Sequence, residues 1–165
     1  MRSKHVLFVC TGNSCRSVMA QALLQHRLKQ MASQLRQPVE VTSAGVFAMD
    51  GMSASRETVR MLAREGIDVS GHMARSLTQE MVRHADLMFV MEPFQHEEVL
   101  RRMPEANEKL HLLKTFGLST LSEAGPPEIP DPIGKPAEVY EACLATIRDC
   151  IERVATSLAA GAEHS

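Results

Sequence analysis

Residues 6–17, from Val6 to Ser17, read VLFVCTGNSCRS and predict both an order of elements and a chemistry. The first four residues are apolar, which is typical of a strand buried on both faces in the middle of a parallel sheet. A polar loop with one glycine follows, and an apolar stripe at helical spacing begins directly after it. We therefore expect a strand, a tight loop and a helix in immediate succession.

The expected loop has five residues between Cys10 and Arg16. This spacing allows the backbone N–H groups to surround a tetrahedral anion, while Arg16 binds two of its oxygens as a bidentate fork. Gly12 and Asn13 are residue types that adopt the turn or left-handed conformations that such a ring requires. The predicted phosphate-binding loop consists of Thr11, Gly12, Asn13, Ser14, Cys15, Arg16 and Ser17.

Cys10 ends the expected strand and would lie beneath the anion. The start of the following helix and the converging N–H groups favour its thiolate form. A thiolate that faces a bound phosphoryl group is set up for in-line attack, which gives a cysteinyl-phosphate intermediate. A buried cysteine that merely ends a strand is the other interpretation. The strand before the loop, Gly-Asn within it and Arg-Ser after it favour the catalytic interpretation.

The leaving oxygen in such a reaction needs a proton, so the mechanism requires a carboxylic acid near the loop. The candidate is Asp131, because the prolines on both sides of it restrict a segment that must hold its position. An ordinary turn aspartate before a proline gives the same pattern, and the local sequence leaves both interpretations open. Ser43 and His72 are candidates for a polar network that supports the loop, although the residues alone favour a solvent-exposed loop histidine at position 72.

Strand and helix patterns alternate along the rest of the chain. This alternation predicts an α/β fold in one domain over residues 1–165, with a four-stranded parallel sheet and helices on both faces, Rossmann-like. Ligands of such sheets bind beyond the carboxyl ends of the strands, which is where the cysteine loop is expected. Further strands are expected at 39–44, 85–91 and 109–113, and helices at 16–35, 55–65, 93–103 and 138–158, with a short helix after Thr78.

The composition argues against several other classes of protein. The net charge is −2 and no basic face stands out, so nucleic acid is not an expected partner. No segment has membrane-spanning length, and the first apolar run is too short for a signal peptide. The four cysteines show neither a disulfide framework nor zinc-ligand spacing. We therefore expect a cytoplasmic protein with neither a membrane segment nor a zinc site.

The loop at 10–17, the Thr42-Ser43-Ala44-Gly45 turn and the late Asp131-Pro132 pair together resemble the low-molecular-weight protein tyrosine phosphatase family. The resemblance covers nearly the whole chain and implies the phosphotyrosine phosphatase I type of fold. It implies Cys10 as the nucleophile, Arg16 as the phosphate clamp, and Asp131 as the general acid and then the general base.

The same resemblance assigns supporting roles. It implies that Asn13, Ser17, Ser43 and His72 hold the loop, and that Cys15 can trap Cys10 in a reversible disulfide under oxidation. It also implies a phosphorylated protein as the substrate, inorganic phosphate or a similar oxyanion in the loop, and no metal or cofactor.

Three positions depart from the pattern of the tyrosine-specific members. Val18 replaces the usual proline, Ile133 replaces an aromatic residue after Asp-Pro, and Ser14 replaces a bulky apolar residue. A small hydroxyl residue at position 14 instead resembles the bacterial protein arginine phosphatases, which have threonine there. We predict hydrolysis of protein phosphotyrosine, with protein arginine phosphatase activity by the same mechanism as the alternative.

Two other functions are less favoured. The identical loop occurs in thioredoxin-coupled arsenate reductases of the same fold, but these need a downstream pair of redox cysteines, and residues 16–142 contain none. A phosphate-binding domain that has lost turnover would also keep the loop. The presence of Cys10, Arg16 and Asp131 argues against that interpretation.

Overall fold

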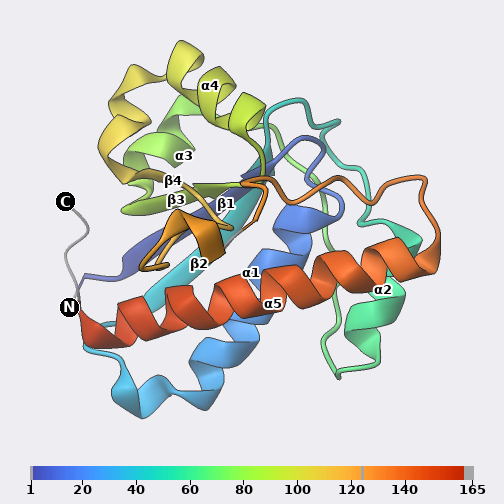
Figure 1. Cartoon of the computed structure of the whole chain (residues 1–165), viewed down its shortest axis with the longest axis horizontal. Helices are drawn as coiled ribbons and strands as arrows, with labels where there is room; N and C mark the ends of the chain where they lie inside the picture. The colour runs from blue at the N-terminus through green and yellow to red at the C-terminus, as the bar shows by residue number, and fades with distance from the viewer. Residues whose placement is uncertain (1, 124, 162–165) are drawn as a thin grey trace.

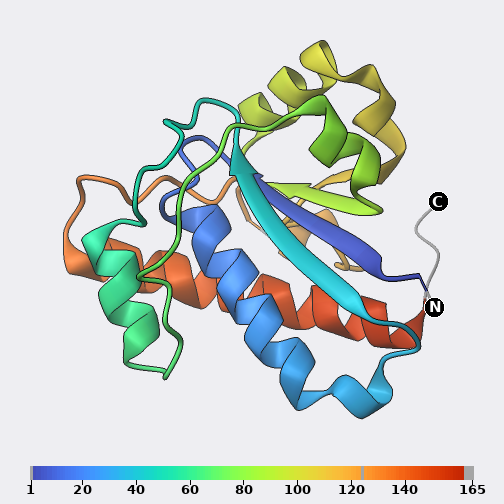
Figure 2. The ribbon, with the colours of Figure 1, turned by 180° about the vertical axis from the view of Figure 1, so that it is seen from behind.

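The sheet is the centre of the molecule. In the computed structural model, which describes residues 2–123 and 125–161, four parallel strands lie in the order β2-β1-β3-β4, with helices on both faces (Figure 1, Figure 2). The predicted single-domain α/β fold is confirmed, whereas the domain bounds of 1–165 stay a prediction. The strands are β1 (Lys4–Cys10), β2 (Val39–Gly45), β3 (Leu87–Val90) and β4 (Leu110–Leu112).

The helices follow the predicted order with shifted ends. The first helix ends at Gln30 instead of residue 35, because the backbone leaves the helical region at Met31 (φ −116°). Ser55 and Thr78 cap the helices that follow them, each through a side-chain oxygen that accepts a backbone N–H. The helices are α1 (Arg16–Gln30), α2 (Arg56–Ala63), α3 (Gln79–His84), α4 (Pro93–Arg102) and α5 (Ala137–Ala160), with short 3-10 turns at Ala32–Gln34, Pro104–Lys109 and Leu121–Glu123.

The side chains of β1 alternate between two apolar cores. Val6, Phe8 and Cys10 belong to the core beneath α1 and α5, whereas Leu7 and Val9 belong to the core beneath α3 and α4. A central strand covered by helices on both faces is apolar throughout for this reason. Cys10 therefore reaches the carboxyl end of the sheet already buried, on the side of α1 and α5.

The strand order creates a switch point next to β1. The chain passes from β1 to β2 on one side of it, and β3 then pairs with its other side. Loops on the two sides of a switch point diverge, and ligands of α/β sheets bind in the resulting crevice. The loop after β1 and the start of α4, which follows β3, both lie at this edge of the sheet (Figure 1).

Candidate active site

Asn13 is the centre of the loop between β1 and α1. It is the only non-glycine residue with a positive φ (54°) among residues 2–123 and 125–161, and it is fully buried. Its Nδ2 donates to Ser17 Oγ (2.8 Å) and Ser43 Oγ (2.9 Å), and its Oδ1 accepts from the Arg75 backbone N–H (3.1 Å). His72 Nε2 lies 2.8 Å from the Asn13 carbonyl oxygen. The predicted support residues therefore meet at one residue, Asn13.

Gly45 lets the end of β2 pack directly against the loop. A Cβ at this position would lie 2.5 Å from the Thr11 carbonyl oxygen, which no side chain tolerates. The next two N–H groups, of Val46 and Phe47, donate to the carbonyl oxygens of Cys10 and Thr11, each at 2.9 Å. In a trans peptide the carbonyl and the next N–H point in opposite directions. The N–H groups that follow these two carbonyls therefore point away from β2.

The Cys10 sulfur lies among hydrogen-bond donors. Its Sγ accepts from the Asn13 backbone N–H (3.3 Å) and is 2.9 Å from Ser17 Oγ, and the residue is 3% exposed. Both groups stabilise a negative sulfur, and α1 begins six residues later with its N-terminal N–H groups at the same loop. Polar groups of the loop and the start of α1 therefore converge on this sulfur.

Arg16 is buried, at 1% exposure, and its guanidinium is fixed on one side by the protein. Nη1 donates to the Ile129 carbonyl oxygen (2.7 Å) and pairs with Glu92 Oε2 (2.8 Å). Nη2 lies 3.6 Å from Asp131 Oδ2. With Nη1 committed to protein acceptors, the Nε and Nη2 edge of the fork is the part that can bind two oxygens of an anion.

Asp131 lies on the segment that leads from β4 to α5. This segment is anchored where the Ile129 backbone N–H donates to the Met91 carbonyl oxygen (2.9 Å), just after β3. Asp131 Oδ1 accepts from the Ile133 backbone N–H (3.1 Å), and the side chain of Asp131 is 41% exposed. The structure thus brings Asp131 to Arg16, which follows the Cys10 loop. The catalytic roles of these three residues stay predictions at this point.

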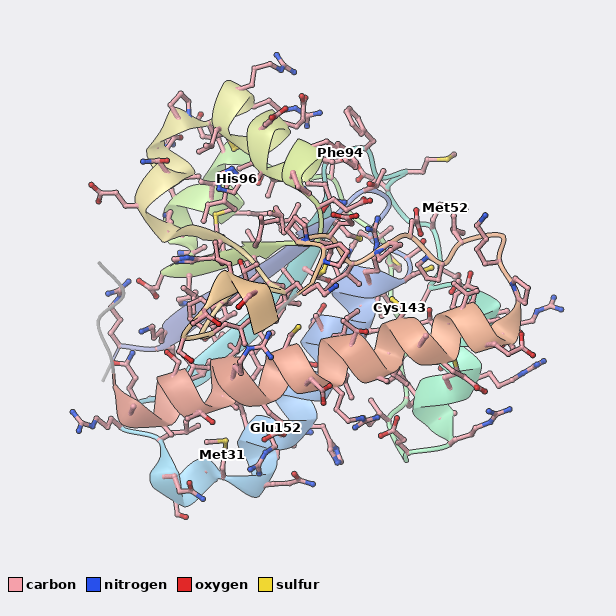
Figure 3. The ribbon with its side chains drawn as sticks, viewed as in Figure 1. Met31, Met52, Phe94, His96, Cys143 and Glu152 are labelled. Atoms are coloured by element: carbon pink, nitrogen blue, oxygen red, sulfur yellow. The ribbon has the colours of Figure 1, made fainter. Side chains whose placement is uncertain are left out.

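A second group of polar residues lies behind the loop. The Cys15 thiol donates to Ser55 Oγ (3.2 Å) and is 4.0 Å from the Tyr140 hydroxyl. Burial, and then the neighbouring Cys15 thiol, raise the pKa of Tyr140. On α5, burial raises the pKa of Cys143 to about 12 (Figure 3). All four cysteines are free, so the reversible disulfide between Cys10 and Cys15 stays a prediction.

Two functional contacts were missed by the sequence reasoning. Glu92 pairs with Arg16, and Gln95 Nε2 donates to Thr11 Oγ1 at 3.0 Å. Both residues follow β3, whose carboxyl end lies beside that of β1. The signal that could have found them is the position of Met91-Glu92-Pro93 directly after a buried strand, since polar residues at that edge face the ligand crevice.

Exposed apolar side chains lie on the segments around the loop. Phe47 is 58% exposed on the segment that follows β2, and Ile133 is 53% exposed beside Asp131. Phe94, at the start of α4, and Met52, between β2 and α2, are also exposed, and both lie on the same side of the molecule as each other (Figure 3). Ser14, within the loop, is half-buried. Apolar groups for a substrate to contact are therefore available on three segments.

Neither a metal site nor a membrane span appears in the described part of the chain. Among residues 2–123 and 125–161, no group of three or more His, Cys, Asp or Glu side chains could hold a metal ion. Over the same residues, none of the helices combines the length and apolar character needed to cross a bilayer.

Comparisons with known proteins agree with this geometry. A family model described as low molecular weight phosphotyrosine protein phosphatase matches residues 5–163. The protein-arginine-phosphatase of Geobacillus stearothermophilus is 39% identical over 153 residues, covering 93% of this chain and 95% of that protein. The probable low molecular weight protein-tyrosine-phosphatase EpsP of Ralstonia solanacearum is 39% identical over 145 residues, covering 88% and 89%. The solved YwlE arginine phosphatase from Geobacillus stearothermophilus superposes with a TM-score of 0.83 at 38% identity, covering 96% of this chain and 94% of that one.

Proposed function

The chain belongs to the low molecular weight phosphotyrosine protein phosphatase family and is a cysteine-dependent phosphatase, and on this premise we propose that Cys10, Arg16 and Asp131 hydrolyse protein phosphotyrosine. In the first step, the Cys10 thiolate attacks the phosphorus in line with the leaving oxygen. A P–S bond forms as the P–O bond to the tyrosine breaks. Asp131 gives its proton to the leaving oxygen, and Arg16 with the loop N–H groups binds the equatorial oxygens.

The second step returns the enzyme to its starting state. Asp131, now a carboxylate, takes a proton from a water molecule that attacks the phosphorus of the phosphocysteine. The P–S bond breaks, inorganic phosphate forms, and the sulfur leaves as a thiolate. The exposure of the Asp131 side chain supports this role, because water must reach the carboxylate once the first product has left.

The observation that carries the proposal is the surrounding of one sulfur. Cys10 Sγ lies within hydrogen-bond distance of the Asn13 N–H (3.3 Å) and of Ser17 Oγ (2.9 Å), at the start of a loop that ends in a buried arginine. A neutral cysteine that merely ends a strand would not require polar contacts of this kind. The arrangement supports a sulfur that becomes negative each time phosphate is released.

A burst experiment tests the proposal. On rapid mixing with p-nitrophenyl phosphate, we expect a burst of nitrophenol close to one equivalent per enzyme, and acid quenching should trap a phosphate on Cys10 in peptide mass spectra. Cys150→Ser is the matched control, since this buried thiol lies on α5 outside the loop, and it should keep the burst. Turnover without a phosphocysteine, or no turnover, would contradict the proposal.

Two observations, the size of Ser14 and the name of one relative, favour protein phosphoarginine as a second candidate substrate. Ser14 is small and half-buried where a bulky apolar side chain would help to grip a phenyl ring. A relative at 39% identity is named protein-arginine-phosphatase. The P–N bond of phosphoarginine still needs protonation of its nitrogen, so Asp131 would act in both reactions. For phosphotyrosine, the exposed Phe47 and Ile133 side chains offer apolar contacts to the ring.

Side-by-side kinetics on matched phosphotyrosine and phosphoarginine peptides decide between the substrates. We expect the higher kcat/KM for phosphotyrosine. Ser14→Ile, which adds an apolar wall, should raise the ratio of phosphotyrosine to phosphoarginine turnover by about tenfold or more, a change of about 1.4 kcal/mol. Turnover of phosphoarginine alone would reverse the assignment of the substrate and leave the mechanism in place.

A further inference from the structure

Gln95 is a buried polar residue whose whole amide is used at the active site. The residue is 0% exposed on the first turn of α4. Its Oε1 accepts from the backbone N–H groups of Met91 (2.8 Å) and Glu92 (3.1 Å), and its Nε2 donates to Thr11 Oγ1 (3.0 Å). A buried amide with both ends bonded is rigid, because breaking either bond leaves a polar group without solvent. Gln95 therefore joins the turn after β3 to the loop after β1.

We propose that Gln95 is a positioning residue, which holds Thr11 and, through Glu92, the Arg16 guanidinium in the arrangement that binds the phosphoryl group. This inference rests on the proposed phosphatase function. It assigns to α4 a part in the reaction that none of the residues of the cysteine loop supplies.

The link from Gln95 to Arg16 passes through Glu92. Gln95 fixes the Glu92 backbone N–H and also lies 3.4 Å from Glu92 Oε2, the oxygen that pairs with Arg16 Nη1 at 2.8 Å. Arg16 has a second carboxylate nearby, Asp131, at 3.6 Å from Nη2. If Glu92 loosens, the guanidinium turns toward Asp131, and the proposed phosphate clamp and general acid are both drawn out of place.

The link from Gln95 to the loop passes through the Thr11 hydroxyl. Thr11 is the first residue after Cys10, and its carbonyl oxygen is already held by the Phe47 N–H at 2.9 Å. The hydroxyl contact with Gln95 fixes the side chain of the same residue. Thr11 is thus held by both β2 and α4, which sets the direction of the peptide that leads away from the sulfur.

Helix capping is the competing account of Gln95, and it can be separated by experiment. Gln95 is the third residue of α4, and an oxygen at this position that accepts the N-cap N–H stabilises a helix by itself. Gln95→Glu keeps that oxygen but loses the amide donor to Thr11 and adds a charge beside Glu92. Gln95→Met loses the cap and the donor but adds no charge. A comparison of the two variants therefore separates the effects of lost capping, of added charge and of the lost contact with Thr11.

The experiment compares these variants in steady-state hydrolysis of p-nitrophenyl phosphate and in thermal unfolding. Positioning predicts that kcat, measured well below the Tm of each variant, falls about tenfold in both, with KM changed less than threefold. Tm should fall in both, through the lost cap in Gln95→Met and through the buried charge beside Glu92 in Gln95→Glu. Gln25→Glu is the matched control, because this exposed glutamine on α1 donates to the Val41 carbonyl oxygen, and it should leave kcat unchanged. A lower Tm with an unchanged kcat would show that Gln95 only caps α4. A lower kcat in Gln95→Glu but not in Gln95→Met would show that the added charge, and not the lost contact, causes the effect.

A double-mutant cycle with Thr11→Val identifies the contact itself. If Gln95 acts through Thr11, the loss of kcat in the double variant with Gln95→Met is smaller than the product of the two single losses by threefold or more. Independent effects that multiply would overturn this part of the inference. If the wild-type enzyme were inactive, the proposed function would fail, and the affinities of the same variants for inorganic phosphate, measured by calorimetry, would test the positioning role separately.

Discussion

The cysteine loop and the Asp131 segment are the two halves of the proposed active site, and they are held in opposite ways. Asn13 and Ser17 of the loop are 0% exposed and are joined to β2 and to the segment at residues 72–75. Asp131 is 41% exposed, and its contacts are one backbone N–H and a 3.6 Å approach to Arg16. Folding builds the first half completely, whereas the second half lies at the surface.

This difference fits the role that we propose for each half. Donors aimed at a developing charge are most effective when they need no reorganisation during the reaction, so a rigid loop suits an anion that is the same in every substrate. A proton donor must reach leaving groups of different shape and then admit water. A half-exposed carboxylate between two prolines meets both requirements. The rigid half is thus the one proposed to bind the phosphoryl group, which is the same in every substrate.

The largest expected effect comes from the rigid half. Cys10→Ser should lower turnover of p-nitrophenyl phosphate by at least about 10⁴-fold, because the nucleophile is lost. Binding of inorganic phosphate, measured by calorimetry, should persist, since Arg16 is held by Ile129 and Glu92, and the loop is held by the Asn13 side chain and by β2 as well as by the sulfur. A variant that binds no phosphate would show that the sulfur itself organises the loop.

The next effect concerns the exposed half. Asp131→Asn should slow hydrolysis of phenyl phosphate, a poor leaving group, by about 10²- to 10³-fold, because the leaving oxygen no longer receives a proton. The loss should be much smaller with p-nitrophenyl phosphate, whose leaving group needs little help. Steady-state kinetics on both esters give the measurement. Equal losses with both esters would place the general acid elsewhere.

The two halves should contribute very different amounts to the free energy of unfolding. Asn13→Ala should lower the free energy of unfolding by about 2 to 4 kcal/mol, because it removes a buried network and places alanine at a positive φ. Asp131→Ala should change it by about 0.5 kcal/mol or less, because the carboxylate is exposed. Urea denaturation gives both values. Asn13→Gly separates the two causes, since glycine accepts the backbone conformation but lacks the network; stability equal to that of the wild type would show that the network contributes little.

The smallest effect is on thiol reactivity. Burial raises the pKa of Cys143 to about 12 and also raises that of Cys150, so both thiols are protonated at pH 7. Iodoacetamide should label Cys10 first, and inorganic phosphate should slow that labelling severalfold by occupying the loop. Peptide mass spectrometry after short exposures measures each site. Labelling of Cys143 in the native protein at a similar rate would contradict this account of α5.

Much of the rigid half could be predicted from local sequence. Strand, Gly-Asn turn and helix start are all encoded within residues 6–17, and Asn13 adopts the left-handed conformation that its residue type suggested. Asp131 was predicted because the leaving oxygen needs a proton donor near the loop, and the structure brings this residue to Arg16. The strand, the loop conformation and the position of Asp131 agree with the structure because each depends on short spacings or on the needs of the chemistry, and the catalytic roles stay predictions.

The contacts of Glu92 and Gln95 could not be predicted, because they depend on which strand lies beside β1. Only the observed order β2-β1-β3-β4 brings the residues after β3 next to Thr11 and Arg16. An alternation of strands and helices indicates a parallel sheet but does not specify its order. The end of α1 at Gln30 was missed for a related reason, since the apolar periodicity continues past the residue at which the backbone leaves the helix.

The residues that hold Asn13 lie well after it in the chain, which affects when the anion site can form during folding. Ser43, His72 and Arg75 are 30, 59 and 62 residues further along the chain, so the anion site cannot exist in a newly made N-terminal fragment. A ligand that binds only the finished site favours folding by mass action, by about 2.7 kcal/mol at a hundred times its dissociation constant. In the proposed mechanism, the phosphate that the enzyme releases therefore also stabilises the folded state of the enzyme.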